Sequence, residues 1–245
     1  MYAGQTLQGE FPYSVVMIIC HPLKIIFIKT KKVAGTSFEL ALSKYCSDEC
    51  IITPLQPQDE ALRVQRGFCG AQNYTLEGRV GRAHPASNNF NLVGDFFNHN
   101  RAAFIRKRVG PRRWREYSKI SIHRDPLDFL LSQYFYQCHA GRVVASFGEW
   151  FQQNKENVLV NRKIAPLTGE LACDIVFDYE RLSEQIRDCT LLPGDFLSVF
   201  ESFTAKSGAR PEASRDVLGF YRAHNICVDE VYDILSAADQ PLASV

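Results

Sequence analysis

Residues 25–42 read IIFIKTKKVAGTSFELAL and pass from an apolar β-branched run, through a lysine-rich turn, into an amphipathic segment. The pattern predicts a strand over 25–29 and a helix over 37–46, where apolar residues recur at helical spacing. A helix that starts directly after a strand presents unpaired backbone N–H groups, which favour an anion. The usual P-loop order is absent, because the lysines precede Gly35 instead of following it. The segment therefore predicts a phosphate-binding turn of unusual residue order.

The candidate anion ligands in this turn are backbone amides, two hydroxyls and one ammonium group. We expect Gly35 to permit close backbone approach, and Lys32 to act as a point charge. The alternative is an ordinary helix start, in which Thr36 or Ser37 caps the helix and the lysines are solvated. This segment alone leaves both interpretations open. The residues concerned are Lys32, Val33, Ala34, Gly35, Thr36 and Ser37.

Further strand patterns occur at 15–19, 119–123 and 174–177, and residues 127–138 carry an apolar stripe at helical spacing. Strands that alternate with helices predict the α/β class. We expect a P-loop-like three-layer fold with a mainly parallel central sheet flanked by helices, forming one domain over residues 1–245. Residues 50–95 are rich in Gly, Asn, Gln and Pro, and we interpret them as a long excursion that lines or covers the substrate site.

Residues 119–136, KISIHRDPLDFLLSQYFY, form a second strand-to-helix unit. Arg124 ends the strand, Asp125 can cap the helix, and Pro126 takes the first helical position. Ser132 follows two helical turns later. An arginine fork and a helix hydroxyl can hold a second phosphate group, although a capped helix start without a ligand would use the same residues.

These two units together resemble the PAPS-dependent sulfotransferases, particularly the carbohydrate-type branch and its bacterial relatives. The segment KVAGTSF (32–38) is similar to the family loop that holds the 5′-phosphosulfate. Arg124, Asp125, Pro126 and Ser132 match the family motif that holds the 3′-phosphate.

The resemblance extends over roughly residues 25–46 and 98–211. It includes NHNRAAFIRKRVGPRRWREYSKISIHRDP (98–126), DIVFDYERLSEQI (174–186) and KSGARP (206–211). The last of these resembles a basic loop that closes over the nucleotide, which implies nucleotide-binding roles for Lys206 and Arg210.

The resemblance implies an enzyme that moves a sulfuryl group from PAPS to an acceptor hydroxyl and releases PAP, with no metal required. Lys32 would stabilise the leaving oxygen, and a histidine would take the acceptor proton. His99 lies where the family carries its catalytic histidine, and His84 is the runner-up; a carboxylate base, or none, stays open. The acceptor would be a glycan or a small metabolite with a hydroxyl or amine, and the oligomeric state is open.

The rival function is an atypical nucleotide kinase or a nucleotide-binding protein without catalysis. A kinase should show G-K-[ST] and a Mg²⁺-holding Asp after a strand, and neither pattern is clear here. The distribution of charge is informative, because nine basic residues lie between Arg101 and Arg124 with Glu116 as the only acid. A solvated helix face is the favoured account of this cluster. A surface for an anionic acceptor is the second, and nucleic-acid binding is disfavoured because the net charge is only +1.

The chain contains eight cysteines without a C-x-x-C pair. A zinc site from Cys46, Cys50, Cys69 and His84 is the disfavoured alternative to small buried residues or free thiols. The apolar runs near the start are too short to span a membrane and do not form a signal peptide, so we expect a cytoplasmic protein without a membrane partner.

Overall fold

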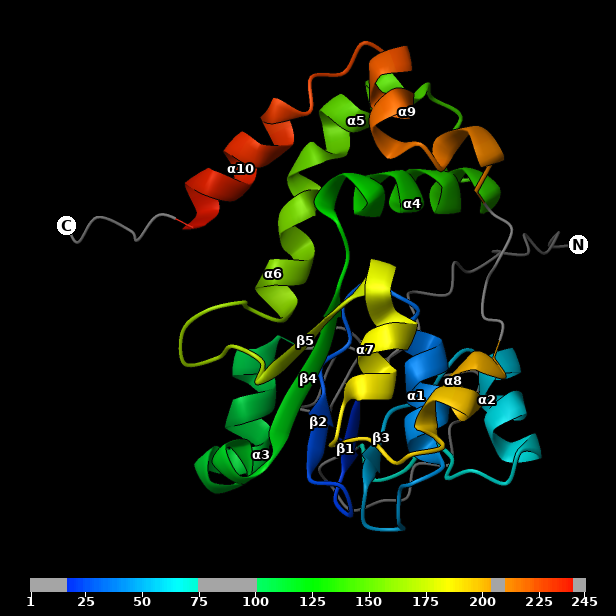
Figure 1. Cartoon of the computed structure of the whole chain (residues 1–245), viewed down its shortest axis with the longest axis vertical. Helices are drawn as coiled ribbons and strands as arrows, with labels where there is room; N and C mark the ends of the chain where they lie inside the picture. The colour runs from blue at the N-terminus through cyan, green and yellow to red at the C-terminus, as the bar shows by residue number, and fades with distance from the viewer. Residues whose placement is uncertain (1–16, 75–100, 204–209, 240–245) are drawn as a thin grey trace, which may run out of the picture.

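The computed structural model describes residues 17–74, 101–203 and 210–239. Its centre is a five-stranded sheet in the order β3-β1-β2-β4-β5 (Figure 1). The α/β class is therefore confirmed. The strands are β1 (Ile18–Cys20), β2 (Ile25–Phe27), β3 (Ile51–Ile52), β4 (Ser118–His123) and β5 (Ile175–Asp178).

The prediction of a mainly parallel sheet is wrong, because the sheet is mixed. β2 pairs in parallel with β4, and β4 in parallel with β5. β1 pairs antiparallel with both β2 and β3. The physical reason is the short turn between β1 and β2, in which the Lys24 amide donates to the His21 carbonyl. A parallel crossover needs a dozen or more residues, so this turn permits only a hairpin.

Helices cover both faces of the sheet, and a further helical layer adjoins it (Figure 1). Alternate strand residues explain the two faces, because neighbouring side chains along a strand point to opposite sides. Phe27 packs with α1, α7 and α8 on one face, and Ile26 packs with α3 and α6 on the other. The helices α4, α5, α9 and α10 pack on one another in a third apolar cluster.

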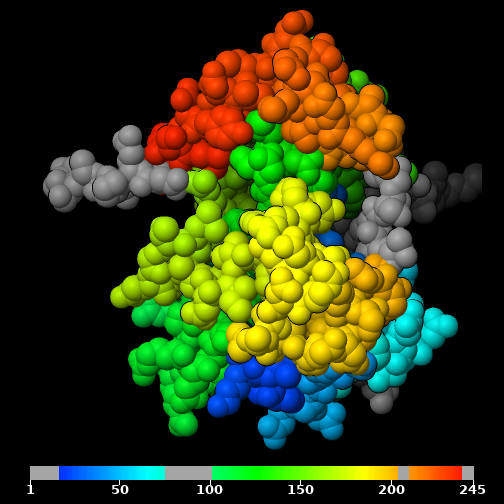
Figure 2. Space-filling model, in the orientation of Figure 1, coloured from blue at the N-terminus to red at the C-terminus, as the bar shows by residue number. Residues whose placement is uncertain are grey.

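The helices have the following bounds: α1 Gly35–Ser43, α2 Pro57–Gln65, α3 Ala102–Glu116, α4 Pro126–His139, α5 Phe147–Asn154, α6 Val160–Ile164, α7 Leu182–Asp188, α8 Phe196–Glu201, α9 Val217–Ala223 and α10 Asp229–Asp239. Short 3₁₀ helices lie at η1 Lys155–Leu159, η2 Tyr179–Arg181 and η3 Glu212–Ser214. No helix within the described ranges is both long and apolar enough to cross a membrane. The space-filling view shows α7 in front of the sheet and the C-terminal helices above it (Figure 2).

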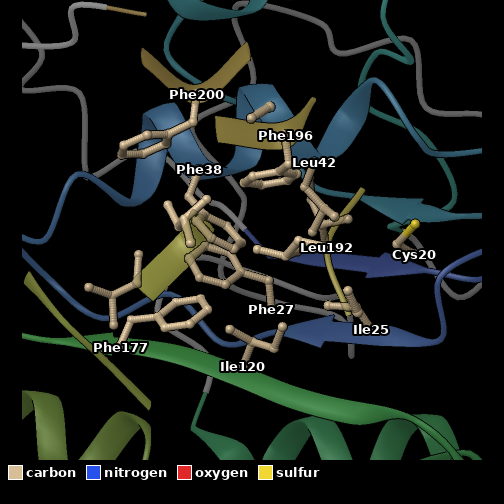
Figure 3. Packing of buried hydrophobic residues seen from close by; sticks show 14 of the residues in the cluster. Cys20, Ile25, Phe27, Phe38, Leu42, Ile120, Phe177, Leu192, Phe196 and Phe200 are labelled. Atoms are coloured by element: carbon tan, nitrogen blue, oxygen red, sulfur yellow. The ribbon is translucent and has the colours of Figure 1, made fainter. Parts of the chain in front are cut away.

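Phe38 on α1 is the centre of the core that fixes this helix to the sheet (Figure 3). Its ring is fully buried and stacks on Phe27 of β2 with centroids 4.4 Å apart. Phe177, Phe196 and Phe200 surround the same ring. Burial of one such side chain contributes about 1.5–3 kcal/mol. The start of α1 therefore has a fixed position above the end of β2.

The excursion predicted over residues 50–95 is in part an element of the scaffold. β3 adds an edge strand to the sheet, and α2 follows it. The Ile52 amide and carbonyl also pair with Gln72. Residues 75–95 lie outside the described chain.

Candidate functional site

The turn between β2 and α1, residues 28–34, is fixed first by hydrogen bonds to β4. The Ile28 amide donates to the Ile120 carbonyl at 2.8 Å, and the Ser121 hydroxyl donates to the Ile28 carbonyl at 2.8 Å. The Thr30 hydroxyl donates to the Ile122 carbonyl. These bonds hold the turn at the carboxyl ends of two parallel strands, where open α/β sheets bind ligands.

A second attachment comes from Asn161 on α6, a residue 93% shielded from solvent. Its side-chain Oδ1 accepts from the Lys31 amide at 2.7 Å, and its Nδ2 donates to the Lys31 carbonyl at 3.0 Å. The amide side chain thus satisfies both backbone groups of one turn residue. The middle of the turn is held on a helix 130 residues away in sequence.

The turn ends in an uncapped helix start. Lys32 and Ala34 both adopt left-handed backbone conformations, with φ of 63° and 55°. Ala34 is the N-cap of α1, and no side chain caps this helix. The alternative of a Thr36 or Ser37 cap is therefore wrong. Successive amides in such a turn form an anion-binding concavity, and the helix dipole adds positive potential.

The start of α4 differs in this respect. The Asp125 carboxylate accepts from the amides of Leu127 and Asp128 at 3.0 and 2.9 Å, so this helix is capped as predicted. Its first amides are already satisfied by a negative group. Of these two helix starts, only that of α1 presents its first amides without a side-chain cap.

Beneath the turn lies a buried polar network that sequence reasoning did not identify. The Lys29 ammonium donates to the Thr36 hydroxyl and to the Glu39 carboxylate, each at 3.0 Å. Glu39 is fully buried, and Lys29 is 8% exposed. A Cβ at Gly35 would lie 2.7 Å from Cγ of Lys29. Gly35 thus makes room for the Lys29 stem, whereas the sequence suggested room for a ligand.

We expect Gly35→Ala to lower the free energy of unfolding by roughly 1–3 kcal/mol, because the new methyl would displace the stem of a buried, ion-paired lysine. Urea unfolding measures the change. The matched control is Gly148→Ala on α5, where a Cβ meets nothing within 4 Å. We expect this control to be neutral or slightly stabilising. Equal unfolding free energies for the two variants would contradict the packing argument.

The Glu39 carboxyl titrates in an unusual range. Burial raises its pKa to about 7, against the opposing effect of the Lys29 ammonium; Arg63 lowers the pKa and Glu60 raises it. An unfolded glutamate has a pKa of about 4.3. Because the pKa of Glu39 is higher in the folded protein than in the unfolded chain, this group raises the free energy of unfolding fully at pH values below the unfolded pKa. The contribution is lost as the pH rises through the folded pKa of about 7.

We expect the stability of the wild type relative to Glu39→Gln to fall by up to roughly 3 kcal/mol between about pH 4 and about pH 8. The glutamine side chain does not titrate in this range, and the two proteins share all other carboxylates. The difference between them therefore reports Glu39 alone. Urea unfolding of both proteins across this range measures the difference. A difference that is constant with pH would show that Glu39 does not titrate there.

Arg124, directly after β4, contacts the turn, α4 and Tyr179. Its side chain is 9% exposed, its Nη1 donates to the Lys32 carbonyl at 2.9 Å, and its Nε donates to Asp128. The guanidinium lies over the Tyr179 ring, 4.2 Å from the centroid. Among the described residues Nη2 has no hydrogen-bond partner, so this nitrogen can donate to an anion.

Asp128 brings a second arginine to the same place. Its two carboxylate oxygens accept from Arg124 and from Arg210. Arg210 also donates to the Ser214 hydroxyl at 2.9 Å. The structure thus joins two predicted nucleotide-binding arginines that are far apart in sequence. Asp128 was not predicted, although its position four residues after Arg124 is the spacing of a helical ion pair.

The face of α4 beside the turn carries Asp128, Ser132 and Tyr136, which are spaced by four residues. The Lys32 ammonium lies over the Tyr136 ring, 3.7 Å from its centroid. This contact and the Arg124 bond to the Lys32 carbonyl bring the turn against the face that carries Ser132, which is half-buried. Tyr136 is a further residue that sequence reasoning missed.

The remaining predicted residues have different positions. The Ser37 hydroxyl donates to the Phe203 carbonyl at 3.2 Å, so it supports the segment before residue 204. Val33 is buried in the core of the sheet. His84, His99 and Lys206 lie outside the described residues.

Four of the nine basic residues between Arg101 and Arg124 form ion pairs with acidic residues that the structure describes. Arg106 pairs with Glu170, Arg112 with Glu116, and Lys119 with Asp174. Trp114, on α3 itself, is buried. Lys119 is the second residue of β4 and Arg124 follows its end, a separation of roughly 16 Å along an extended strand.

Two surface cavities lie near the starts of β2 and β4, away from the turn. A cavity of about 450 Å³ is lined by residues that include His21, Asn73 and Tyr117. Another of about 360 Å³ is lined by residues that include Trp114 and Lys119. His21 donates to or accepts from the Tyr117 hydroxyl at 2.8 Å. Neither cavity includes a residue of the turn.

Comparison of the chain with protein-family models, with curated proteins and with solved structures finds no match.

Proposed function

We propose that the chain is a PAPS-dependent sulfotransferase with a P-loop-like nucleotide site. One observation carries the proposal: an uncapped, left-handed turn with Lys32 is bonded through its backbone to Arg124 and lies against the Ser132 face of α4. The sequence resemblance assigns 5′-phosphosulfate binding to the turn, and 3′-phosphate binding to Arg124 and Ser132. The structure supports this assignment because the two groups are adjacent.

The donor set fits a nucleotide with two separate anionic groups. Amides of the turn and the Lys32 ammonium suit one group, and Nη2 of Arg124 with the Ser132 hydroxyl suits the other. Arg210 adds a further positive charge near Arg124, because both arginines donate to Asp128. A nucleotide without a 3′-phosphate would leave the second set unused.

In the proposed reaction the acceptor oxygen forms a bond to sulfur while the bond from sulfur to the phosphate oxygen breaks. The transition state carries charge on the sulfuryl oxygens and on the departing phosphate, so positioned cations stabilise it. We assign this role to Lys32. The acceptor proton goes to a general base, for which His99 is the first choice and His84 the second. The proposal includes no metal.

The acceptor in this proposal is a glycan or a small metabolite that carries a hydroxyl or an amine. An anionic acceptor would need basic residues near Lys32. Arg124 is the member of the basic cluster that contacts the turn. We assign it to the nucleotide, so it would not bind the acceptor.

Calorimetric titration with PAP, ADP and ATP in the absence of Mg²⁺ tests the proposal. We expect PAP to bind at least tenfold more tightly than ADP, because only PAP carries the 3′-phosphate. Equal affinities would contradict the assignment of Arg124 and Ser132. Nucleotide binding that requires Mg²⁺ would favour the kinase-like alternative.

We expect His99→Ala to lower transfer about 10²-fold and to leave PAP affinity unchanged, because a base acts on the acceptor and not on the nucleotide. The rate of PAP release from PAPS, with an acceptor found by screening, measures transfer. His84→Ala tests the second choice. His139→Ala is the matched control, since His139 follows Tyr136 by three residues on α4. A loss of transfer in this control alone would overturn both assignments.

A further inference from the structure

Three cysteines that are separate in sequence meet at one corner of the sheet. Cys20 ends β1, Cys46 follows α1, and Cys50 precedes β3. Their three Sγ atoms all lie within 4.8 Å of one another. Cys20 and Cys50 are buried, and Cys46 is half-buried. Figure 3 shows Cys20 at the edge of the main core.

The sulfur of Cys50 accepts hydrogen bonds from two backbone amides. The backbone amides of His21 and Ser47 both donate to its Sγ, each at 3.2 Å. The Ser47 hydroxyl lies 3.5 Å from the same sulfur. A neutral thiol is a weak acceptor, so two amides directed at one sulfur suit a cysteine that binds a metal. The thiolate is the form that binds metals.

The number and spacing of the sulfurs favour a metal ion over a disulfide. Three thiolates at the usual Zn–S distance of about 2.3 Å in a tetrahedron are about 3.8 Å apart, and the three sulfurs here lie within 4.8 Å of one another. A disulfide would use two of the three sulfurs and leave the third unpaired. Cys69 donates to the Cys46 carbonyl at 3.1 Å, which places a fourth thiol beside the cluster, although its sulfur is outside the group of three.

We propose that Cys20, Cys46 and Cys50 bind one thiophilic divalent cation, with Zn²⁺ as the chemistry that fits. The ion would tie the end of β1 to the end of α1 and to the two-residue edge strand β3. The nine residues of α1 separate this corner from the turn at Lys32 by roughly 13 Å. The site is therefore structural and independent of the proposed nucleotide site.

Titration of the reduced, metal-free full-length protein with Co²⁺ tests the proposal, since thiolate ligands give intense charge-transfer absorption. We expect saturation at one Co²⁺ per chain, displacement by Zn²⁺, and a rise of about 5 °C in Tm with Zn²⁺. Cys46→Ser and Cys50→Ser should lose the absorption. Cys173→Ser, a half-buried cysteine outside the cluster, should retain it.

Absence of charge-transfer absorption in the wild type would overturn the proposal without reference to any variant. Absorption that persists in Cys50→Ser would also overturn it. So would a disulfide between two of the three cysteines in the protein as isolated, detected by alkylation and mass spectrometry. PAP titration of the metal-free protein separates the two proposals, because we expect its PAP affinity to be unchanged.

Discussion

Lys32→Ala is expected to lower the rate constant for sulfuryl transfer about 10³-fold and to weaken PAP binding less than tenfold. The ammonium group is placed over Tyr136 at the end of the turn, where the leaving phosphate would develop charge. A cation positioned for that charge acts mainly in the transition state, so its loss appears in kcat more than in affinity. PAP release from saturating PAPS and acceptor measures the effect.

The substitution should leave the fold intact, because alanine and lysine meet the same restriction at the φ of 63° that residue 32 adopts. Lys107→Ala on α3 is the control, since Lys107 is an exposed lysine far from the turn in sequence. We expect the control to behave as the wild type. A variant at position 32 with normal kcat would remove this residue from the catalytic role.

Arg124→Ala is expected to weaken PAP binding about 10²-fold while changing ADP binding much less. The guanidinium is fixed by Asp128, the Lys32 carbonyl and the Tyr179 ring, and its Nη2 is the nitrogen that would donate to the 3′-phosphate. A charge-assisted hydrogen bond to phosphate contributes roughly 2–3 kcal/mol, which corresponds to this loss. Calorimetry with both nucleotides measures the ratio.

The variant should also unfold more easily, by roughly 2 kcal/mol, because Asp128 keeps only Arg210 and the Lys32 carbonyl loses its donor. Titrations therefore need a temperature at which the variant is folded. Arg112→Ala, which removes an exposed i,i+4 ion pair, is the matched control. If PAP and ADP weaken equally, Arg124 acts only by holding the turn, and the 3′-phosphate assignment fails.

Local patterns were sufficient for the elements nearest the site. The β-branched run before the lysines and the Arg-Asp-Pro sequence predicted β2, β4, α1 and α4, and Asp125 caps α4 as expected. These predictions succeed because strand patterning and capping depend on residues that are close in sequence. The α/β class follows from the same signals.

The antiparallel edge of the sheet was missed for two reasons. The strands predicted at 15–19 and 25–29 are too close in sequence for a parallel crossover, so this spacing already limited β1 to a hairpin with β2. The edge strand β3 has only two residues, too few for a periodic pattern. Its place in the sheet depends on pairing between strands, which local propensity does not encode.

The sequence by itself determined the two strand-to-helix units and the residue types that they present. Only the tertiary structure decided which partners those residues meet: Lys29 with Glu39, Asn161 with the Lys31 backbone, and Asp128 with Arg210. It also gathered Cys20 with Cys46 and Cys50. The physical reason is that packing of the core sets contacts between distant segments, whereas sequence patterns report the preferences of each segment alone.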